Sequence, residues 1–293
     1  MSTILKTENI TKDYGEGRGA IDISIEIKSK EIVGFIGPNG AGKTTTLSML
    51  THLITPNYGS YSLFNKKIES EADYLSVADK IGSLPSEGGL YESLTARKLL
   101  TYAASLYDCS VDQIDELASN FKLDLDKKIR NLSLGNKRKV GLIQSLLHNP
   151  KLLILDEPTS GLDPLIQKQV LEIIRKVKER GGAVLLSSHN LAEVESICDR
   201  VIMIKAGKII FSGKTIEILK KSLKRFRIEN VSKEVYREVE KLESVKRIEY
   251  IADDVIAYVD DPREILEYLR KKNNYNFYLE RPTLEEAFSE YYQ

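Results

Sequence analysis

The chain has 293 residues, which is enough for one sizeable hydrophobic core and one small additional domain. Its 43 basic and 43 acidic residues balance, so the composition indicates no general attraction to nucleic acid or anionic lipid, and we expect no nucleic-acid partner. The two cysteines, Cys109 and Cys198, lack metal-binding or redox spacing, which excludes a zinc module and is typical of a reducing cytosol.

The chain shows neither a signal-peptide pattern at its start nor an apolar run of the ~18–20 residues that a membrane span requires. We therefore expect a soluble chain in the cytoplasm. A role at a membrane would require a separate partner that supplies the membrane-spanning part.

Residues 4–30 alternate apolar and polar side chains, most clearly in Ile21–Ile27 (IDISIEI). A period of two is typical of half-buried strands in an antiparallel sheet. The next apolar residues, 31–36, predict another strand, and the helix that follows the loop after it is expected to stop near Thr55 and Pro56.

The loop between this strand and helix reads GPNGAGKTT, which is the G-x-x-x-x-G-K-[ST] phosphate-binding pattern in its strand-to-helix context. Glycines let the backbone approach phosphate oxygens, and the N–H groups of the loop and of the helix start cradle anions. Lys43 would place its charge against the β- and γ-phosphates, and Thr44 would offer a hydroxyl to Mg²⁺. The candidate nucleotide-binding residues are Gly37, Pro38, Asn39, Gly40, Ala41, Gly42, Lys43, Thr44 and Thr45.

A second part of a phosphate site follows the apolar run Leu152–Leu155, which predicts a strand buried on both faces of a parallel sheet. Asp156 stands at the carboxyl end of this strand, where open α/β sheets bind ligands, and would hold Mg²⁺. Glu157 is the candidate general base that activates the attacking water. The cofactors expected from these two parts are ATP and Mg²⁺.

Between the two parts, residues 88–148 read as helical. Ser110 and Gln113 predict a capping box for one helix. Ser133 and Gly135 begin another helical pattern, which Asn149 and Pro150 stop.

Several motifs in matching order make residues 4–215 resemble the ATP-binding cassette (ABC) ATPases. Residues 132–136 (LSLGN) are similar to the family's signature motif, usually LSGGQ, and Ser160–Asp163 (SGLD) to its D-loop. His189, after the apolar run 183–186, is similar to the switch histidine. Tyr14 is similar to the aromatic residue that stacks on adenine.

The resemblance implies how these residues work. Ser133 and Gly135 would contact the γ-phosphate held by the opposite subunit, and Asp163 would lie in the D-loop. The chain would then act as a head-to-tail homodimer with two nucleotides at the interface. Glu157, His189 and Lys43 would be its catalytic residues.

The chain departs from the family pattern at one loop, where Ser86 occupies the position of the usual glutamine. That glutamine normally touches Mg²⁺ or the attacking water, and Ser86 is too short for the same reach. Glu87 is the alternative residue for this role. The signature is also irregular, because Leu134 and Asn136 replace a glycine and a glutamine, and Arg138 stands where glutamine is common.

The remaining residues have a strand and helix rhythm of their own, in the order β-α-β-β-α-β of a ferredoxin-like split βαβ. Within it, Asp261 is expected to cap a helix that begins at Pro262, with Glu264 completing a capping box, and Thr283 with Glu286 is expected to cap the last helix. Residues near 216–224 read as a charged helical linker. The ending, residues 281–288 (RPTLEEAF), resembles the tail of the ABC subfamily that powers exporters.

We therefore expect two domains: a P-loop NTPase cassette of α/β class over residues 1–215, and a small α+β ferredoxin-like domain over 216–293. The cassette would combine an antiparallel β subdomain, a parallel-sheet core and an inserted helical subdomain. The expected function is the ATP-hydrolysing subunit of an ABC exporter. It would lie on the inner face of the cell membrane, attached through integral-membrane permease subunits.

Two alternatives remain open. The first is a soluble ABC ATPase that acts on DNA or ribosomes, although the chain has neither a long coiled coil between P-loop and signature nor a second P-loop. The second is a nucleotide-sensing module with weak turnover. Ser86 favours that module, whereas Glu157 and His189 argue against it.

Overall fold

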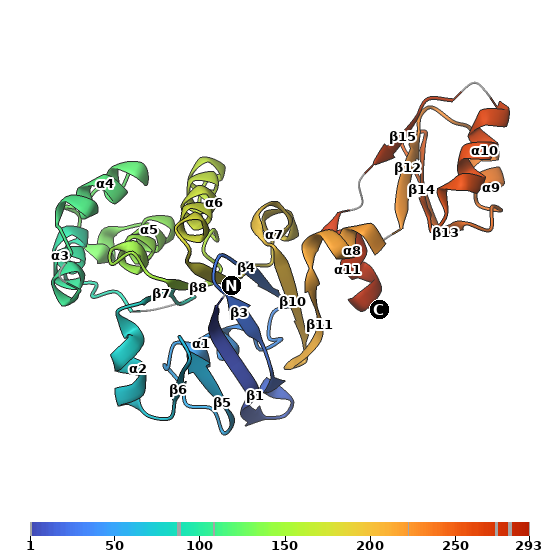
Figure 1. The fold of residues 1–293 in the computed structure, drawn as a ribbon. Coiled ribbons are helices and arrows are strands. Elements are labelled where there is room, and N and C mark those ends of the chain that lie inside the picture. The colour runs from blue at the N-terminus through green and yellow to red at the C-terminus, as the bar shows by residue number, and fades with distance from the viewer. Residues whose placement is uncertain are drawn as a thin grey trace. The chain divides into compact units, whose positions relative to one another are not determined.

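The computed structural model describes residues 2–86, 89–107, 109–221, 223–272, 275–280 and 283–292. The chain divides into two units, Met1–Gly213 and Lys214–Gln293, which are described separately (Figure 1). Glu87, which was the alternative to Ser86 for the role of the usual glutamine, lies outside the described residues.

The centre of the first unit is a six-stranded sheet in the order β11-β10-β4-β9-β8-β7. From β10 to β7 each neighbouring pair is parallel. All residues of β4, β8 and β9 are buried, as the continuous apolar runs predicted, because layers cover both faces of the sheet. The strands are β4 (Ile32–Ile36), β7 (Ile81–Leu84), β8 (Leu152–Asp156), β9 (Ala183–Ser187), β10 (Arg200–Lys205) and β11 (Lys208–Lys214).

The alternating residues near the start form a second, antiparallel sheet. The stretch read as one alternating run is divided into two strands, because Ile23 pairs with Ile10 and Ile27 pairs with Leu5 of the long first strand. Asp22 has a φ of 54°, which bends the chain at this division. The strands are β1 (Thr3–Gly15), β2 (Arg18–Ile23), β3 (Glu26–Lys28), β5 (Tyr58–Leu63) and β6 (Lys66–Ile68).

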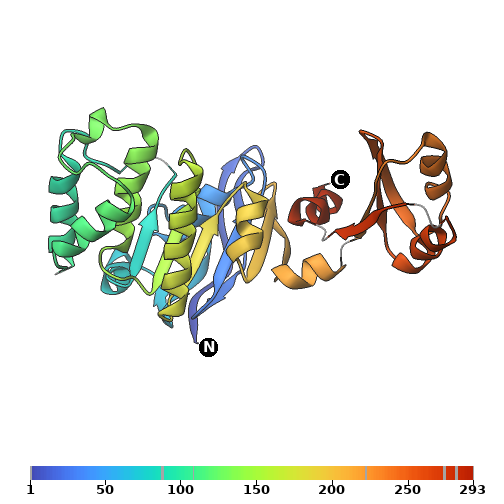
Figure 2. The same cartoon turned by 90° about the horizontal axis from the view of Figure 1, so that it is seen from above.

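Helix α1 (Lys43–Leu50) lies between the two sheets, and its Leu47 and Leu50 join one buried cluster with residues of both. α1 ends at Leu50 rather than near Pro56, because His52 takes a left-handed φ of 57° and the Leu53 N–H donates to the carbonyl of Ser48 at 2.9 Å. Helices α6 (Pro164–Glu179) and α7 (Leu191–Ile197) lie along one face of the central sheet (Figure 2). Helix α2 (Glu71–Ala78), which we did not predict, packs near β6 and β7.

Three further helices, α3 (Ala96–Leu106), α4 (Asp112–Asn120) and α5 (Leu134–Leu146), form a group of their own (Figure 1). The predicted Ser110–Gln113 capping box is wrong, because α4 begins at Asp112 and the Ser110 hydroxyl accepts the Asp112 N–H instead, at 3.2 Å. A short 3₁₀ turn, Ile129–Asn131, leads towards α5. Among the described residues, none of the helices has both the length and the apolar character of a membrane span.

The second unit contains a four-stranded sheet in the order β13-β14-β12-β15, with every neighbouring pair antiparallel. The elements follow one another as β-α-β-β-α-β, as in a split βαβ motif. Phe226 of the sheet, Val235 of α9 and Ile265 of α10 share one buried cluster. The elements are β12 (Lys224–Ile228), α9 (Lys233–Val239), β13 (Val245–Ile251), β14 (Asp254–Val259), α10 (Pro262–Lys272) and β15 (Phe277–Glu280).

The caps of this unit follow the sequence only in part. Asp261 accepts the Arg263 N–H at 3.0 Å before α10, as expected, but Glu264 makes no capping box there because it accepts the Ser244 N–H at 2.8 Å. The Thr283–Glu286 capping box of α11 (Leu284–Tyr292) is confirmed in both directions, at 2.9 and 3.2 Å. The predicted linker includes helix α8 (Thr215–Lys221), which contacts α11.

Candidate nucleotide site

The glycine-rich loop lies between the buried strand β4 and the start of α1. Gly42 precedes the helix with a φ of 102°, and a Cβ at this position would lie 2.3 Å from the carbonyl oxygen of Gly19. Only glycine therefore fits this turn without strain. Asn39 and Gly40 are exposed at the tip of the loop, whereas Ala41 is buried beneath it.

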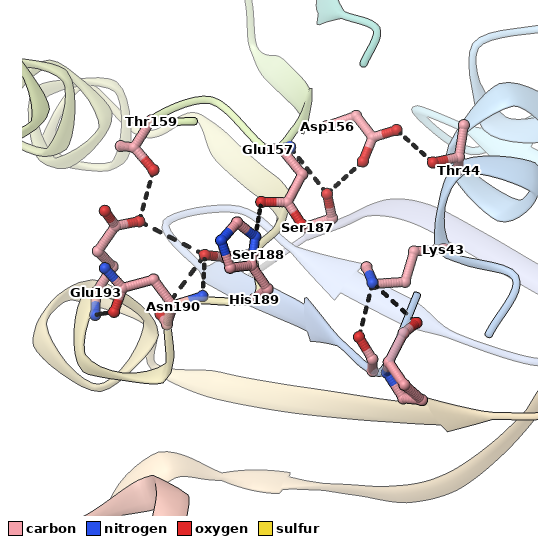
Figure 3. Close-up of polar contacts among 12 residues, drawn as sticks. Lys43, Thr44, Asp156, Glu157, Thr159, Ser187, Ser188, His189, Asn190 and Glu193 are labelled. Carbon is pink, nitrogen blue, oxygen red and sulfur yellow. Dashed lines mark hydrogen bonds and ion pairs between the residues drawn. The ribbon is translucent and has the colours of Figure 1, made fainter. Parts of the chain in front are cut away.

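Lys43 is the first residue of α1, and only 7% of it is exposed. Its Nζ donates to the carbonyls of Gly37 at 2.6 Å and Pro38 at 3.1 Å, so the ammonium group lies against the loop (Figure 3). Burial lowers the pKa of Lys43 from its ordinary value, and the nearby Glu157 and Asp156 carboxylates oppose this change. An anionic ligand at this point would stabilise the buried positive charge of Lys43.

Asp156 ends β8 and is 3% exposed. Its Oδ2 accepts the Thr44 hydroxyl at 2.7 Å, and its Oδ1 accepts the hydroxyl of Ser187. Ser187 ends the neighbouring strand β9, opposite Asp156 in the parallel register. Sequence reasoning missed Ser187, although it directly follows an apolar run, just as Asp156 does.

Glu157 follows Asp156 in a left-handed backbone conformation, with a φ of 52°. This conformation is unfavourable for a residue with a side chain and persists where neighbouring groups fix it. The Glu157 N–H donates to the Ser187 hydroxyl at 2.9 Å, and its carbonyl accepts the Ser160 N–H at 3.2 Å. The chain therefore turns at Glu157, directly after β8.

His189 meets this carboxylate from the segment after β9, with 2.6 Å between its Nδ1 and Oε2 of Glu157 (Figure 3). The Glu157 side chain is 18% exposed and that of His189 is 67% exposed. The pair therefore lies at the protein surface, where the Glu157 carboxylate can accept a proton from a water molecule.

A second layer holds the segment that carries His189. The buried Glu193 of α7 accepts the Thr159 hydroxyl at 2.7 Å, and it also lies 3.5 Å from the Ser188 hydroxyl. Asn190 caps α7 by accepting the N–H groups of Ala192 and Glu193. These contacts connect the turn after Glu157 to the turn around His189 (Figure 3).

Lys43, Asp156 and Glu157 line a cavity of about 320 Å³. Tyr14, which is 52% exposed, lines it beside Arg18, a residue that the motifs did not indicate. The full lining is Tyr14, Arg18, Gly19, Asn39, Gly40, Gly42, Lys43, Thr44, Thr45, Ser86, Asp156 and Glu157.

The signature and D-loop residues are not part of this lining. Ser133 is exposed and caps α5 by accepting the Asn136 N–H at 3.3 Å. Gly135 follows it in the first turn of the helix. Asp163 caps α6 by accepting the Ile166 N–H at 3.1 Å. The structure thus does not place these three residues in the chain's own cavity.

Ser86 lies at the rim of the main cavity, and it also lines a second cavity of about 20 Å³. Thr44, Ser48, Ser83 and Asp156 share this smaller lining. Apolar side chains, among them Leu47 and Ile154, complete the lining, and a space of this size is sufficient for about one water molecule. The short side chain at the glutamine position therefore leaves room beside Asp156.

The residues present fit Mg²⁺. Hydroxyl and carboxylate oxygens are the hard ligands that this ion prefers, and Thr44 and Asp156 bring both types together. In the described part of the chain, the groups that hydrogen-bond to the Asp156 carboxylate are two hydroxyls, neither of which carries positive charge. A bound cation would stabilise the negative charge of this buried carboxylate.

A parallel sheet with a P-loop before α1 and a carboxylate pair after β8 defines a P-loop nucleoside triphosphatase. Its particular family follows from comparison with known proteins. The ABC transporter family model matches residues 21–160. An ABC transporter ATP-binding protein of Methanocaldococcus jannaschii is 36% identical, over 88% of this chain and 95% of its own length. This chain belongs to the ABC transporter ATP-binding protein family, as the motifs predicted.

Other relatives agree with this assignment. The bacitracin transport ATP-binding protein BcrA of Bacillus licheniformis is 38% identical, over 72% of this chain and 69% of its own length. A solved ATP-binding subunit of an ABC transporter is 30% identical and covers 74% of this chain and 92% of its own, with a TM-score of 0.68. The fold is also shared with a dimeric ATP-binding cassette in a post-hydrolysis state, bound to ADP and Pi. That structure is 24% identical and covers 72% of this chain and 99% of its own, with a TM-score of 0.66.

Proposed function

We propose that this chain is the Mg²⁺-dependent ATPase subunit of an ABC exporter. Two copies would close head to tail on two Mg·ATP, and hydrolysis would let them separate. The movement would drive separate integral-membrane permease subunits from the cytoplasmic face of the membrane. The observation that carries the proposal is that Lys43, Asp156 and Glu157 line one cavity and that His189 contacts the Glu157 carboxylate.

Each of these residues has a distinct task in the proposed reaction. Glu157 accepts a proton from the attacking water, and His189 orients that carboxylate through its 2.6 Å contact. Lys43 stabilises charge on the β- and γ-phosphates. Thr44 and Asp156 would hold Mg²⁺, which supplies neutralisation of phosphate charge. Tyr14 would stack on the adenine, which is worth about 1–3 kcal/mol.

The dimer is proposed because Ser133 and Gly135 lie at the start of α5 and outside the chain's own cavity. An exposed helix start presents N–H groups and a positive dipole end, which suit the γ-phosphate on a second copy. A structural neighbour is described as dimeric. Export is proposed from the resemblance of the chain's ending and from the relative described as a bacitracin transport protein.

The test is the Glu157→Gln variant, which keeps the shape of the side chain but cannot accept the proton. Phosphate release from Mg·ATP should fall by about 10²–10⁴-fold while ATP binding persists. The variant should therefore accumulate as an ATP-bound dimer in gel filtration. Glu172→Gln, a surface change whose partner is Arg175, is the matched control. A Glu157→Gln variant that hydrolyses ATP at the control's rate would refute the assigned base.

The link to a permease needs a separate experiment. The tagged chain should co-purify with an integral-membrane protein from gently solubilised membranes. Mg·ATP hydrolysis in the complex should then respond to transported cargo. Recovery of the chain without any membrane protein, under conditions that preserve other ABC complexes, would argue against the transport proposal.

A further inference from the structure

Arg138 of α5 connects two loops of the site through backbone carbonyls. Its Nη1 donates to the carbonyls of Pro85 at 3.0 Å and Ser86 at 2.9 Å. Its Nη2 donates to the carbonyls of Asp156 and Glu157. One guanidinium group therefore joins the loop at the glutamine position to the turn that carries the candidate base.

The chemistry of arginine suits this arrangement. A guanidinium group is a planar fork of donors, and it can serve two pairs of acceptors at once. Burial lowers the pKa of Arg138, whereas the Asp156 and Glu157 carboxylates oppose that change. Glutamine, which is common at this position in the family, has a single amide nitrogen and cannot make the same set of bonds.

The contact at Glu157 matters most, because the backbone of this residue is strained. Ser187 fixes its N–H from β9, and Arg138 binds its carbonyl from α5. Holding both peptide groups fixes the direction in which the carboxylate leaves the chain. Displacing a reacting group by about 1 Å can lower a rate by about 10²-fold.

The same side chain also contacts the loop at the glutamine position. The Ser86 side chain is short, but the Ser86 carbonyl is 2.9 Å from Nη1 of Arg138. The loop is thus connected to the catalytic turn through its backbone rather than through its own side chain. A shift of α5 or of this loop would therefore move the Arg138 guanidinium group and, through it, the backbone of Glu157.

We propose that Arg138 is a positioning residue for hydrolysis, which holds Glu157 in its working direction and couples it to α5 and to the loop at Ser86. The inference rests on the proposed role of Glu157 as general base. Arg138 itself contacts backbone carbonyls and not the reacting atoms.

The first test compares Arg138→Ala with Lys137→Ala, a control that removes a neighbouring cation whose Nζ pairs with Glu92 at 2.6 Å. Arg138→Ala should lower kcat by about 10²-fold. The Kd for ATP should stay close to that of the control, because the P-loop is untouched. Arg138→Ala removes the donor of four backbone carbonyls, so its unfolding temperature should fall, and kcat is compared at a temperature where both variants are folded. Equal kcat values in the two variants would overturn the inference. A fall in ATP affinity as large as the fall in kcat would also overturn it.

The second test uses single-turnover phosphate release. If Arg138 acts through Glu157, adding Arg138→Ala to Glu157→Gln should cause no further loss of rate. A further loss of similar size in the double variant would show that Arg138 acts elsewhere and would overturn the inference. Wild-type rates in Glu157→Gln alone would instead refute the proposed base, so the two failures are distinguishable.

Arg138→Lys guards against loss of folding in the alanine variant. It keeps the charge and most of the length, but it loses the planar fork. We expect it to fold, to bind ATP as the wild type does and to retain the low kcat. Full recovery of kcat by lysine would show that charge alone suffices, and it would overturn the positioning role of the fork.

Discussion

Lys43 is the single side chain from which we expect a large contribution to ATP affinity. Its buried ammonium group is held by the carbonyls of Gly37 and Pro38, which are neutral acceptors. Phosphate oxygens would replace these acceptors with charged ones, and hydrogen bonds to charged groups are worth about 1.5–3 kcal/mol. The P-loop lysine is thus expected to contribute mainly through charge.

We predict that Lys43→Ala lowers ATP affinity by about tenfold or more, which corresponds to the loss of one such bond. Titration calorimetry at fixed ionic strength measures the effect. Lys208→Ala on β11 removes the same charge from an exposed position and serves as the control. Indistinguishable Kd values for the two variants would contradict the role given to Lys43.

Ser86 provides a second prediction at this scale. The cavity of about 20 Å³ beside Ser86 and Asp156 can hold about one water molecule, which the amide of a longer side chain would displace. If the short side chain limits the positioning of the attacking water, Ser86→Gln should raise the basal rate of ATP hydrolysis. The control Ser105→Gln, at an exposed position of α3 that lines neither cavity, should not raise this rate. An unchanged rate in Ser86→Gln would show that this position does not limit turnover.

At the scale of elements, the site depends on how two loops are held together. Glu193 of α7 accepts the hydroxyl of Thr159, which lies in the turn after β8. Both residues are buried, so neither group can exchange its partner for water. This bond connects α7 to the turn that follows the candidate base.

We predict that Glu193→Ala destabilises the first unit by about 1–3 kcal/mol, because the Thr159 hydroxyl would lose its buried partner. Denaturant unfolding measures the change. Glu179→Ala, at the exposed end of α6, controls for the loss of a glutamate from a helix. Recovery of stability in the double change Glu193→Ala, Thr159→Val would support the pairing, whereas equal loss in single and double variants would oppose it.

At the scale of the whole molecule, the two units have separate buried clusters. The cluster of the first unit includes Phe35 and Leu50, and that of the second includes Phe226 and Val239. A unit with its own core can usually fold alone. The residues that line the nucleotide cavity all belong to the first unit.

We predict that a chain ending at Gly213 folds and binds Mg·ATP with the affinity of the full-length protein. The second unit would then serve the stability of the dimer or the coupling to transport. Circular dichroism establishes that the shortened chain is folded, and calorimetry gives its Kd. A folded chain that has lost ATP binding would show that residues after Gly213 contribute to the site.

The sequence by itself determined the parts that depend on local pattern. The apolar run Leu152–Leu155 predicted a buried strand, and GPNGAGKTT predicted the loop between β4 and α1, because strand burial and phosphate binding both constrain neighbouring residues. Short polar stretches gave less information, so α2 was missed and the start of α4 was wrong.

Only the tertiary structure decided which distant groups meet. Ser187 and Asp156 are 31 residues apart, and Arg138 reaches the carbonyl of Glu157 from 19 residues away. No periodicity encodes such contacts, since they depend on strand register and on the packing of α5. The strained φ of Glu157 likewise has no mark in the sequence, because neighbouring strands and helices impose it. The motifs thus predicted which residues form the candidate site, whereas the fold decided how those residues are positioned.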